Sequence, residues 1–396
     1  MMYPIVQLKK GRESSLKSRH PWIFSGALRR DKQEIPHGAT IWVEDSSGTV
    51  AATGTYSAKS SIAVRVFAFS DAAIDTEFLG QRIGEADKRR RLLGLGPDTD
   101  TTGYRVVFGE SDGLPGLTVD RYGDVLVMQL ATAGMDRLRE DVVTALVEIF
   151  EPTAVYERSD LATREEEGLK PIVGLRHGEL PDKTEFLENG RRFLAHAAEG
   201  QKTGFFLDQR EQRAAIAGLS DGRKVLDLFS YRGAAAVTAL ISGAESVHCV
   251  DSSAWALEGC PEHAALNGLD ESKLTTEEAD IFQWLGSRSK PEYDMIILDP
   301  PALVKSRKHA EAGRKGYHFV NRAALRVIRD GGILVTSSCS QHFPEDDFRV
   351  TLRRASEQAG VDLHLLRSLR QAEDHPIALH FPESYYLKTF VCQVRR

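Results

Sequence analysis

The chain has 396 residues, of which 41% are hydrophobic and 27% are charged, and it carries a net charge of -6. This composition is typical of a folded protein of two or three domains and excludes a disordered or fibrous chain. The sequence has no run of 18 apolar residues and begins without the apolar stretch of a signal peptide, so we expect a cytoplasmic protein without a membrane segment.

Residues 1–75 are expected to form a small β-barrel, because IPHGATIWVEDSSGTVAATGTYSAKSSIAVRVFAF alternates apolar and polar residues between glycines. The preceding stretch, KKGRESSLKSRHPWIFSGALRR, interleaves basic and aromatic side chains. Cations bind phosphates and aromatic rings stack on bases, so this stretch indicates RNA contact through Lys17, Arg19, Trp22 and Phe24. The alternative is a solvated basic loop beside a core Trp and Phe.

Residues 76–185 are expected to form a linking helix followed by an α+β middle domain. We expect two strands in YRVVFGESDGLPGLTVDRYGDVLVMQL, a helix in DRLREDVVTALVEIF and a further strand in AVYERSD. Glu110 and Asp112 could bind a metal ion, but the neighbouring turn residues favour a structural role for these carboxylates.

Residues 186–396 alternate strand and helix patterns. The apolar runs are KVLDLF, SVHCVD, YDMIILDP and GGILVTSSC, with helical segments between the first three. Such runs are typical of parallel strands covered on both faces, so we expect a doubly wound α/β sheet. Ligands of such a sheet bind beyond the carboxyl ends of the strands.

Acidic residues stand where these strands are expected to end, at Asp227, Asp251, Asp280 and Asp299. The first run continues as LDLFSYRGAAAVTAL, which resembles the first motif of S-adenosylmethionine methyltransferases, although Phe229 and Tyr231 stand where glycine is usual. These side chains would obstruct a dinucleotide pyrophosphate, which S-adenosylmethionine lacks. We expect Asp251 to contact the cofactor ribose and Asp280 its adenine; helix capping is the alternative for both.

Cys339, in VTSSCSQHF, is the candidate nucleophile. Ala302 follows the two prolines of ILDPPALVK where amino-methylating enzymes usually carry an aromatic residue, which favours chemistry at carbon. The C5 atom of cytosine is too electron-poor to attack a methyl group unaided, whereas a thiolate that adds at C6 activates it. We expect Asp299 to hold the base at N3.

The alternative for Cys339 is a buried core cysteine, which is what we expect for Cys249, Cys260 and Cys392. The four cysteines have no C-x-x-C spacing, so the sequence predicts neither a metal site nor a disulfide framework. No residue is assigned as the base that removes the C5 proton; His342 and His375 are weak candidates.

With these motifs the chain resembles the 23S ribosomal RNA cytosine-C5 methyltransferase I family over nearly its whole length. The matching stretches are RHPWIFSGA, GESDGLPGLTVDRYGD, KTGFFLDQR, LDLFSYRGAAAV, DPP, SSCS and RQAEDHP. The resemblance implies a PUA-type RNA-binding barrel at 1–75, an α+β domain at 76–185 and a Rossmann-like S-adenosylmethionine methyltransferase domain at 186–396. One departure is His318 and Phe319, where relatives tend to carry Lys and Asp.

The resemblance also implies the site. Cys339 would be the nucleophile and Asp299 would position the base. The cofactor would be S-adenosylmethionine, in contact with Phe206, Asp208, Gln209, Arg210, Asp227, Phe229, Ser230, Gly233, Asp251, Asp280 and Asp299. The function implied is methyl transfer to a cytosine C5 in 23S ribosomal RNA. The alternatives are a methyltransferase for another RNA or base atom and a non-catalytic RNA-binding assembly factor. The sequence permits a homodimer without requiring one.

Overall fold

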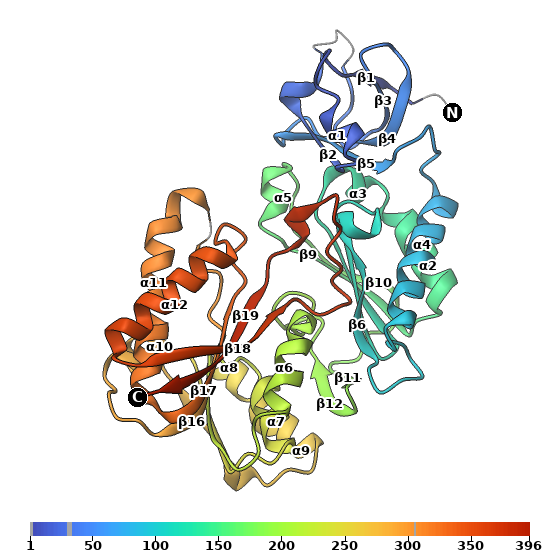
Figure 1. Cartoon of the computed structure of the whole chain (residues 1–396). Coiled ribbons are helices and arrows are strands. Elements are labelled where there is room, and N and C mark those ends of the chain that lie inside the picture. Colours follow the sequence, from blue (N-terminus) through green and yellow to red (C-terminus); the bar gives the residue numbers. More distant parts are fainter. Residues whose placement is uncertain (1–2, 30–33, 305) are drawn as a thin grey trace. The chain divides into compact units, whose positions relative to one another are not determined.

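The computed structural model describes residues 3–29, 34–304 and 306–396, which divide into two compact units (Figure 1). Unit 1 contains the residues up to Gly190 together with Leu194–Leu207 and Glu373–Ser384. Unit 2 contains Arg191–Phe193, Asp208–Ala372 and Tyr385–Arg396. The predicted ranges 1–75 and 76–185 lie in unit 1, whereas the predicted range 186–396 contributes to both units.

The first sheet of unit 1 has the order β1-β3-β4-β5-β2 over its described residues. Its strands are β1 (Ile5–Gln7), β2 (Trp22–Phe24), β3 (Thr40–Glu44), β4 (Val50–Tyr56) and β5 (Ile62–Ala68), with α1 (Ser14–Lys17) and the 3-10 turn η1 (Ser25–Ala27). Ile41 and Val43 alternate with half-buried neighbours on β3 and are fully buried. The alternation in the sequence therefore predicted this sheet correctly.

The second sheet of unit 1 has the order β10-β9-β8-β7-β6. Its strands are β6 (Gly103–Phe108), β7 (Leu117–Tyr122), β8 (Val125–Leu130), β9 (Ala154–Ser159) and β10 (Ile172–Gly178). Its helical elements are α2 (Thr76–Leu92), η2 (Gly109–Asp112), α3 (Ala133–Arg137), α4 (Arg139–Phe150) and α5 (Thr163–Glu166). The expectation of two strands across this block was wrong, because a tight turn at Gly123, with φ +54°, separates β7 from β8.

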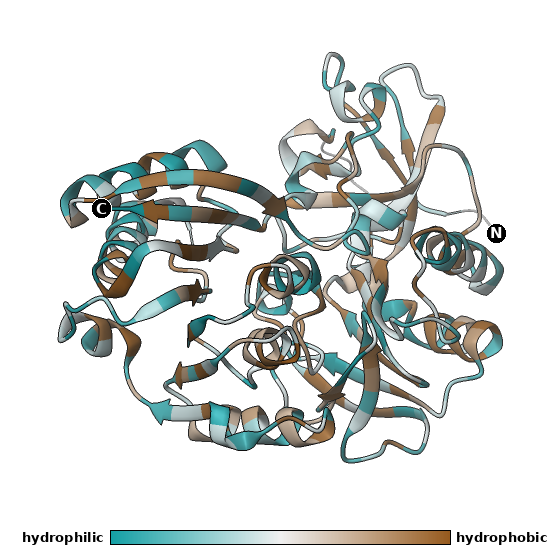
Figure 2. Cartoon of the chain, turned by 60° about the horizontal axis from the view of Figure 1, so that its bottom comes forward, coloured by the Kyte–Doolittle hydropathy of each residue, from teal (hydrophilic) through white to brown (hydrophobic). Residues whose placement is uncertain are grey.

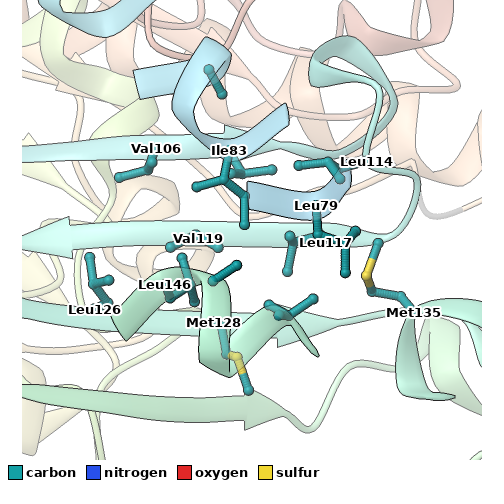
Figure 3. Packing of buried hydrophobic residues seen from close by; sticks show 14 of the residues in the cluster. Leu79, Ile83, Val106, Leu114, Leu117, Val119, Leu126, Met128, Met135 and Leu146 are labelled. Atoms are coloured by element: carbon teal, nitrogen blue, oxygen red, sulfur yellow. The ribbon is translucent and has the colours of Figure 1, made fainter. Parts of the chain in front are cut away.

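Helices α2 and α4 pack on this second sheet and close its core. Figure 3 shows Leu79 and Ile83 of α2 and Leu146 of α4 lying over the strands that carry Leu117 and Val119, and all five side chains are fully buried. Helix α2, in the range predicted for a linking helix, therefore contributes to the core of unit 1.

Asp112 lies in a buried ion pair rather than in a metal site. Its carboxylate accepts hydrogen bonds from Arg90 Nη1 at 2.8 Å, Arg90 Nη2 at 2.7 Å and the Phe108 amide at 2.7 Å. Burial acts to raise the pKa of Asp112, but the Arg90 charge outweighs it and the pKa is lowered. Glu110 accepts from Trp22 Nε1 and Arg65 Nη1, each at 2.8 Å, so the structural interpretation of both carboxylates is confirmed.

We expect Asp112→Ala to lower the free energy of unfolding by about 3–5 kcal/mol, because it leaves the buried Arg90 charge uncompensated. Urea denaturation followed by circular dichroism measures this change. The exposed Asp182→Ala is the matched control and should change stability by less than about 0.5 kcal/mol. A loss below about 1 kcal/mol for Asp112→Ala would contradict the prediction.

A short two-stranded pairing joins β11 (Thr184–Glu188) and β12 (Arg191–Ala195). The sheet of unit 2 has the order β15-β14-β13-β16-β17-β19-β18 among the described residues. Its strands are β13 (Lys224–Leu228), β14 (Ser246–Asp251), β15 (Leu274–Glu278), β16 (Tyr293–Leu298), β17 (Ile328–Ser338), β18 (Asp362–Arg370) and β19 (Lys388–Arg395). Strands β13 to β17 pair in parallel, and β19 runs antiparallel to both of its neighbours.

The helices of unit 2 are α6 (Arg210–Ala217), α7 (Ala234–Ile241), α8 (Ala254–Leu257), α9 (Gly259–Leu266), α10 (Ile281–Gly286), α11 (Ala310–Val327) and α12 (Glu345–Ala359). The remaining 3-10 turns of the chain are η3 (Leu207–Gln209), η4 (Glu271–Lys273), η5 (Arg307–His309) and η6 (Pro382–Ser384). Helix α11 connects β16 to β17, a connection for which we expected no helix from the sequence.

Helices cover both faces of this sheet. Val225 of β13 packs with Ala236 of α7 on one face, whereas Leu226 and Leu228 pack with α10 and α11 on the other. Figure 2 shows hydrophilic and hydrophobic bands along the helices, as expected for elements that bury one side. The predicted doubly wound α/β architecture is confirmed.

The outer strand β18 exposes Leu365 by 44% and Leu366 by 49%. This edge permits a homodimer, as the sequence does, without requiring one. Within the described ranges, no helix is both long and apolar enough to cross a membrane.

Candidate active site

The carboxyl ends of the parallel strands of unit 2 gather the predicted acidic residues and Cys339 at one edge. Asp227 and Asp251 lie at the ends of β13 and β14, which pair side by side. Leu298 of β16 lies opposite Thr336 of β17, so Asp299 and Cys339, which follow these strands, leave the sheet at the same edge.

Asp227 is buried beside two other carboxylates. It is 2% exposed, and its Oδ2 atom has no hydrogen-bond partner among the described residues. Burial, followed by the charges of Asp299 and Asp251, raises the pKa of Asp227 to about 8. In the described part of the chain, no group of three or more His, Cys, Asp or Glu could hold a metal ion. The negative charges of the neighbouring carboxylates suit an organic cation.

The turn after β13 explains why glycine is usual in this motif. Phe229 and Tyr231 have φ values of +60° and +49°, a region that favours glycine. Gly233 has φ +73°, and a Cβ atom there would lie 2.7 Å from Cys260 Sγ. The turn therefore tolerates side chains at two positions but requires glycine at 233, while Ser230 within it is buried.

Asp251 and Asp280 both organise backbone amides. Asp251 accepts from the Tyr231 amide at 2.8 Å and the Ser253 amide at 3.0 Å. Asp280 is exposed and caps α10 by accepting from the Gln283 amide at 2.9 Å. The capping alternative is thus confirmed for Asp280, and the contacts of both residues with ribose and adenine stay predictions.

Gln209 joins the site through Asp299. Its Nε2 atom donates to Asp299 Oδ2 at 2.8 Å, and since a carboxylate only accepts, this bond fixes the orientation of the amide. The buried Gln209 Oε1 has no hydrogen-bond partner within the described residues. The sequence had indicated Gln209 only as a cofactor contact.

The other residues of the FFLDQR stretch differ in their surroundings. Asp208 is buried and accepts from Tyr386 Oη at 2.7 Å. Arg210 is buried, with its Nε atom 3.8 Å from the Glu211 carboxylate. Phe206 belongs to unit 1, where Lys202 Nζ lies 4.4 Å from its ring centre. Cofactor contacts of these residues stay predictions.

Cys339 differs from the other three cysteines in exposure, because it is half-buried whereas they are fully buried. The neighbouring Ser340 is held firmly: its Oγ atom accepts from the Val304 amide at 3.1 Å and lies 2.9 Å from Tyr317 Oη. Lys388 Nζ donates to the Ser340 carbonyl at 2.7 Å.

Tyr317 and Lys388 were missed by the sequence analysis. The signal for Lys388 was available, since it is the only charged residue in the otherwise apolar or neutral stretch LKTFVCQV. Tyr317 follows Gly316 in α11, a helix that the sequence analysis did not expect.

An open pocket of about 680 Å³ adjoins this edge and is lined in part by Phe282, Leu303, Gly313 and Gly316. Leu303 follows Asp299 by four residues, and a cavity of this size accommodates a small organic ligand. Phe319, at the position that departs from the family pattern, stacks on Phe282 with ring centres 5.8 Å apart.

The two histidines considered as bases lie in different surroundings. His375 is buried in unit 1, with Nδ1 3.0 Å from Asp374 Oδ1, which indicates a structural role. His342 is exposed in unit 2. His342 stays an untested, weak candidate for the base.

The predicted RNA contacts lie in unit 1: Lys17 ends α1, Arg19 lies in the following turn, and Trp22 and Phe24 belong to β2 of the first sheet. Lys17, Arg19 and Phe24 are exposed, Phe24 by 51%, and the Arg19 guanidinium lies 4.7 Å from the Phe69 ring centre. Trp22 is half-buried, with its ring 4.8 Å from that of Phe381 and its indole hydrogen-bonded to Glu110. Trp22 thus packs within unit 1, and RNA binding by these residues stays a prediction.

Comparisons with known proteins agree with this architecture. Residues 6–69 match the PUA-like domain family, and residues 172–377 match the S-adenosylmethionine-dependent methyltransferase family. A candidate S-adenosylmethionine-dependent methyltransferase from Streptococcus mutans has a solved structure that matches with a TM-score of 0.84 at 22% identity. The match covers 98% of this chain and 100% of that one, which shows the shared fold. Another solved candidate methyltransferase with the same TM-score is complexed with SAH.

The fold, the acidic strand edge and the family match define a methyltransferase that uses S-adenosylmethionine and carries a PUA-like domain. Ribosomal RNA large subunit methyltransferase I from Serratia proteamaculans is 42% identical over 391 residues, covering 98% of both chains. The enzyme of the same name from Yersinia pestis matches equally well. The chain therefore belongs to the ribosomal RNA large subunit methyltransferase I family.

The acidic cluster fits the cofactor. S-adenosylmethionine carries a sulfonium and an ammonium group, and the unpartnered Asp227 Oδ2 is a buried acceptor that suits such a cation. Gly233 is required by packing within the chain, because a Cβ atom there would lie 2.7 Å from Cys260 Sγ. The carboxylates of Asp227 and Asp251 would therefore suit such a cation, and a cofactor contact of Gly233 stays a prediction.

We expect Asp227 to release a proton when S-adenosylmethionine binds at pH 7. With a pKa of about 8 the free carboxyl is mostly protonated, and a bound cation lowers that pKa. Calorimetric titration in buffers of different ionisation enthalpy measures the released proton. Asp227→Asn should abolish the buffer dependence, whereas equal heats in all buffers for the wild type would contradict the prediction.

The same shift has a consequence for stability without the cofactor. The pKa of Asp227 is higher in the folded protein than in the unfolded chain. Its contribution to the free energy of unfolding is therefore fully present below about pH 4 and is lost as the pH rises through about 8.

Proposed function

We propose that this protein transfers the methyl group of S-adenosylmethionine to C5 of a cytosine in 23S ribosomal RNA, through a covalent bond between Cys339 and C6. The observation that carries the proposal is the half-buried Cys339 at the same strand edge as Asp299 and the buried Asp227. Relatives that are 42% identical bear the name ribosomal RNA large subunit methyltransferase I, which supports the substrate class.

Cytosine C5 needs activation before it can accept a methyl group. The Cys339 sulfur adds to C6, and the ring becomes an enamine with a nucleophilic C5. Asp299, held by Gln209 at 2.8 Å, binds the N3 edge and supplies the proton that N3 takes up as the ring gains electrons. The cofactor provides an electrophilic methyl group on its sulfonium. A base then removes the C5 proton, and the Cys339 thiolate leaves as the ring double bond reforms and N3 returns its proton to Asp299.

The target base must leave the helical stack, because neither face of C6 is accessible within it. In unit 1 the exposed side chains of Lys17, Arg19 and Phe24 offer phosphate contacts and a stacking surface. We propose that they help to bind the RNA. A ribosomal RNA substrate would locate the enzyme in the cytoplasm.

The direct test is incubation of the full-length protein with methyl-labelled S-adenosylmethionine and 23S RNA from cells that lack this enzyme, followed by nucleoside mass spectrometry. We expect the label in 5-methylcytidine. Label in another nucleoside would contradict the chemistry at C5, and methylation of another RNA alone would contradict the substrate. Failure to bind the cofactor in calorimetry would indicate an assembly factor instead.

A further inference from the structure

Lys388 is a buried charge next to the candidate nucleophile, and the proposed reaction has not used it. It is 3% exposed and opens β19, where it lies opposite Ser338, the last residue of β17, in the antiparallel register. Cys339 is the next residue beyond that pair. A buried ammonium group is unfavourable unless acceptors and negative charge compensate it.

The ammonium group of Lys388 fixes the backbone after Cys339. Its Nζ atom donates to the Ser340 carbonyl at 2.7 Å. The Ser340 hydroxyl is held in turn by the Val304 amide and by Tyr317 of α11. Three separate segments therefore hold Ser340, which restricts where the Cys339 side chain can lie.

The charges around Lys388 point to Cys339 as its anionic partner. Burial lowers the pKa of Lys388 to about 8, and the negative charges of Cys339 and Glu345 oppose this effect. Glu345 is already compensated, because it accepts from Arg349 Nη2 at 2.7 Å and from Tyr385 Oη at 2.8 Å. A thiolate at Cys339 would supply the remaining compensation.

We propose that Lys388 is a positioning residue whose ammonium group orients the Cys339 backbone and favours the thiolate form of Cys339. The inference rests on the proposed role of Cys339 as nucleophile. The thiol proton goes to solvent while Lys388 keeps its own proton, so the resulting pair carries no net charge. A nucleophile is then present at neutral pH, where an ordinary thiol with a pKa of about 8.5 is mostly protonated.

Alkylation of Cys339 by iodoacetamide as a function of pH tests this inference without RNA or cofactor. Mass spectrometry of the Cys339 peptide from the full-length protein gives the rate. We expect a wild-type midpoint below about pH 8.5. Lys388→Met should move the midpoint upward and slow alkylation at pH 7 at least about fivefold. Lys224→Met is the matched control, because Lys224 opens β13 at the opposite edge of the sheet, and should leave the profile unchanged.

Glu345, Tyr317 and Tyr385 do not titrate in the relevant range. For Glu345, burial acts to raise the pKa, but the hydrogen bonds from Arg349 and Tyr385 lower it overall, so the carboxylate stays ionised. Burial raises the pKa values of Tyr317 and Tyr385 above their ordinary value of 10.0, so both stay neutral. Because Asp227, with a pKa of about 8, lies at the same strand edge, a midpoint between roughly pH 6 and 9 is assigned to Cys339 together with Lys388 only where it moves in Lys388→Met.

Two results would overturn the inference: a wild-type midpoint at or above about pH 8.5, or an unchanged midpoint in a folded Lys388→Met variant. If that variant does not fold, Lys388→Arg keeps the charge and must keep the low midpoint; a rise would overturn the inference. If the wild type forms 5-methylcytidine but Cys339 alkylates with an unshifted midpoint, the role of Lys388 is refuted and the proposed function stands. A wild type with a low midpoint that does not methylate C5 refutes the proposed function.

Discussion

Replacement of Cys339 by alanine is expected to slow methyl transfer to 23S RNA at least about a thousandfold. Without the Cys339 thiolate, C5 of cytosine stays too electron-poor to accept the methyl group, because the proposed mechanism has no other nucleophile to activate it. The affinity for S-adenosylmethionine should stay close to that of the wild type, because the acidic cluster around Asp227 is intact. Cys339→Ser should be similarly inactive, since a hydroxyl is far less acidic than a thiol.

Single-turnover methyl transfer and calorimetric binding of the cofactor measure both expectations. Cys392→Ala removes a buried thiol from the neighbouring strand β19 and is the matched control, which should keep its activity. An active Cys339→Ala variant would return Cys339 to a packing role and would require a different activation of the base.

Asp299→Asn is expected to reduce methyl transfer by about two to four orders of magnitude. The amide preserves the volume and can still accept from Gln209, but it supplies no proton to N3 of the base. The same change removes a negative charge that raises the pKa of Asp227, so that pKa should fall below about 8. Proton release on cofactor binding at pH 7 should then become smaller.

The matched control is Asp294→Asn, at the opposite end of the same strand. Asp294 accepts from the Lys224 amide at 3.0 Å, a bond that the asparagine oxygen can preserve, so activity should be unchanged. Full activity of Asp299→Asn would show that this carboxyl does not act on the base.

The sheet of unit 2 could be predicted from the sequence because its signals are local. The parallel strands β13, β14, β16 and β17 contain apolar runs, and Asp227, Asp251 and Asp299 stand at the ends of such runs. The polar parallel strand β15 (LTTEE) was missed. Parallel pairing places those ends at one edge, so the acidic edge followed from the strand pattern alone. The half-buried Cys339 was located for the same reason.

Contacts between distant segments could not be predicted. Gln209 reaches Asp299 across 90 residues of sequence, and Lys388 reaches Ser340 across 48. No periodicity or turn signal encodes such a contact, which arises only when separate strands and helices pack together.

Local structure also escaped prediction where its signals were weak. The turn at Gly123 occupies two residues between apolar runs, so β7 and β8 appeared as one strand. In the sequence, Phe229 stood where glycine is usual in this motif. In the structure Phe229 itself adopts a positive φ, so the turn forms without glycine at this position.

The central claim is the covalent bond between Cys339 and the target base, and RNA that contains 5-fluorocytidine tests it most directly. After methyl transfer, fluorine at C5 cannot be removed as a proton would be, so the thioether to C6 cannot break. We expect a denaturation-resistant adduct of protein and RNA that requires S-adenosylmethionine and maps to Cys339 in peptide mass spectrometry. An adduct at another residue, or no adduct from an enzyme that methylates unmodified RNA, would contradict the mechanism.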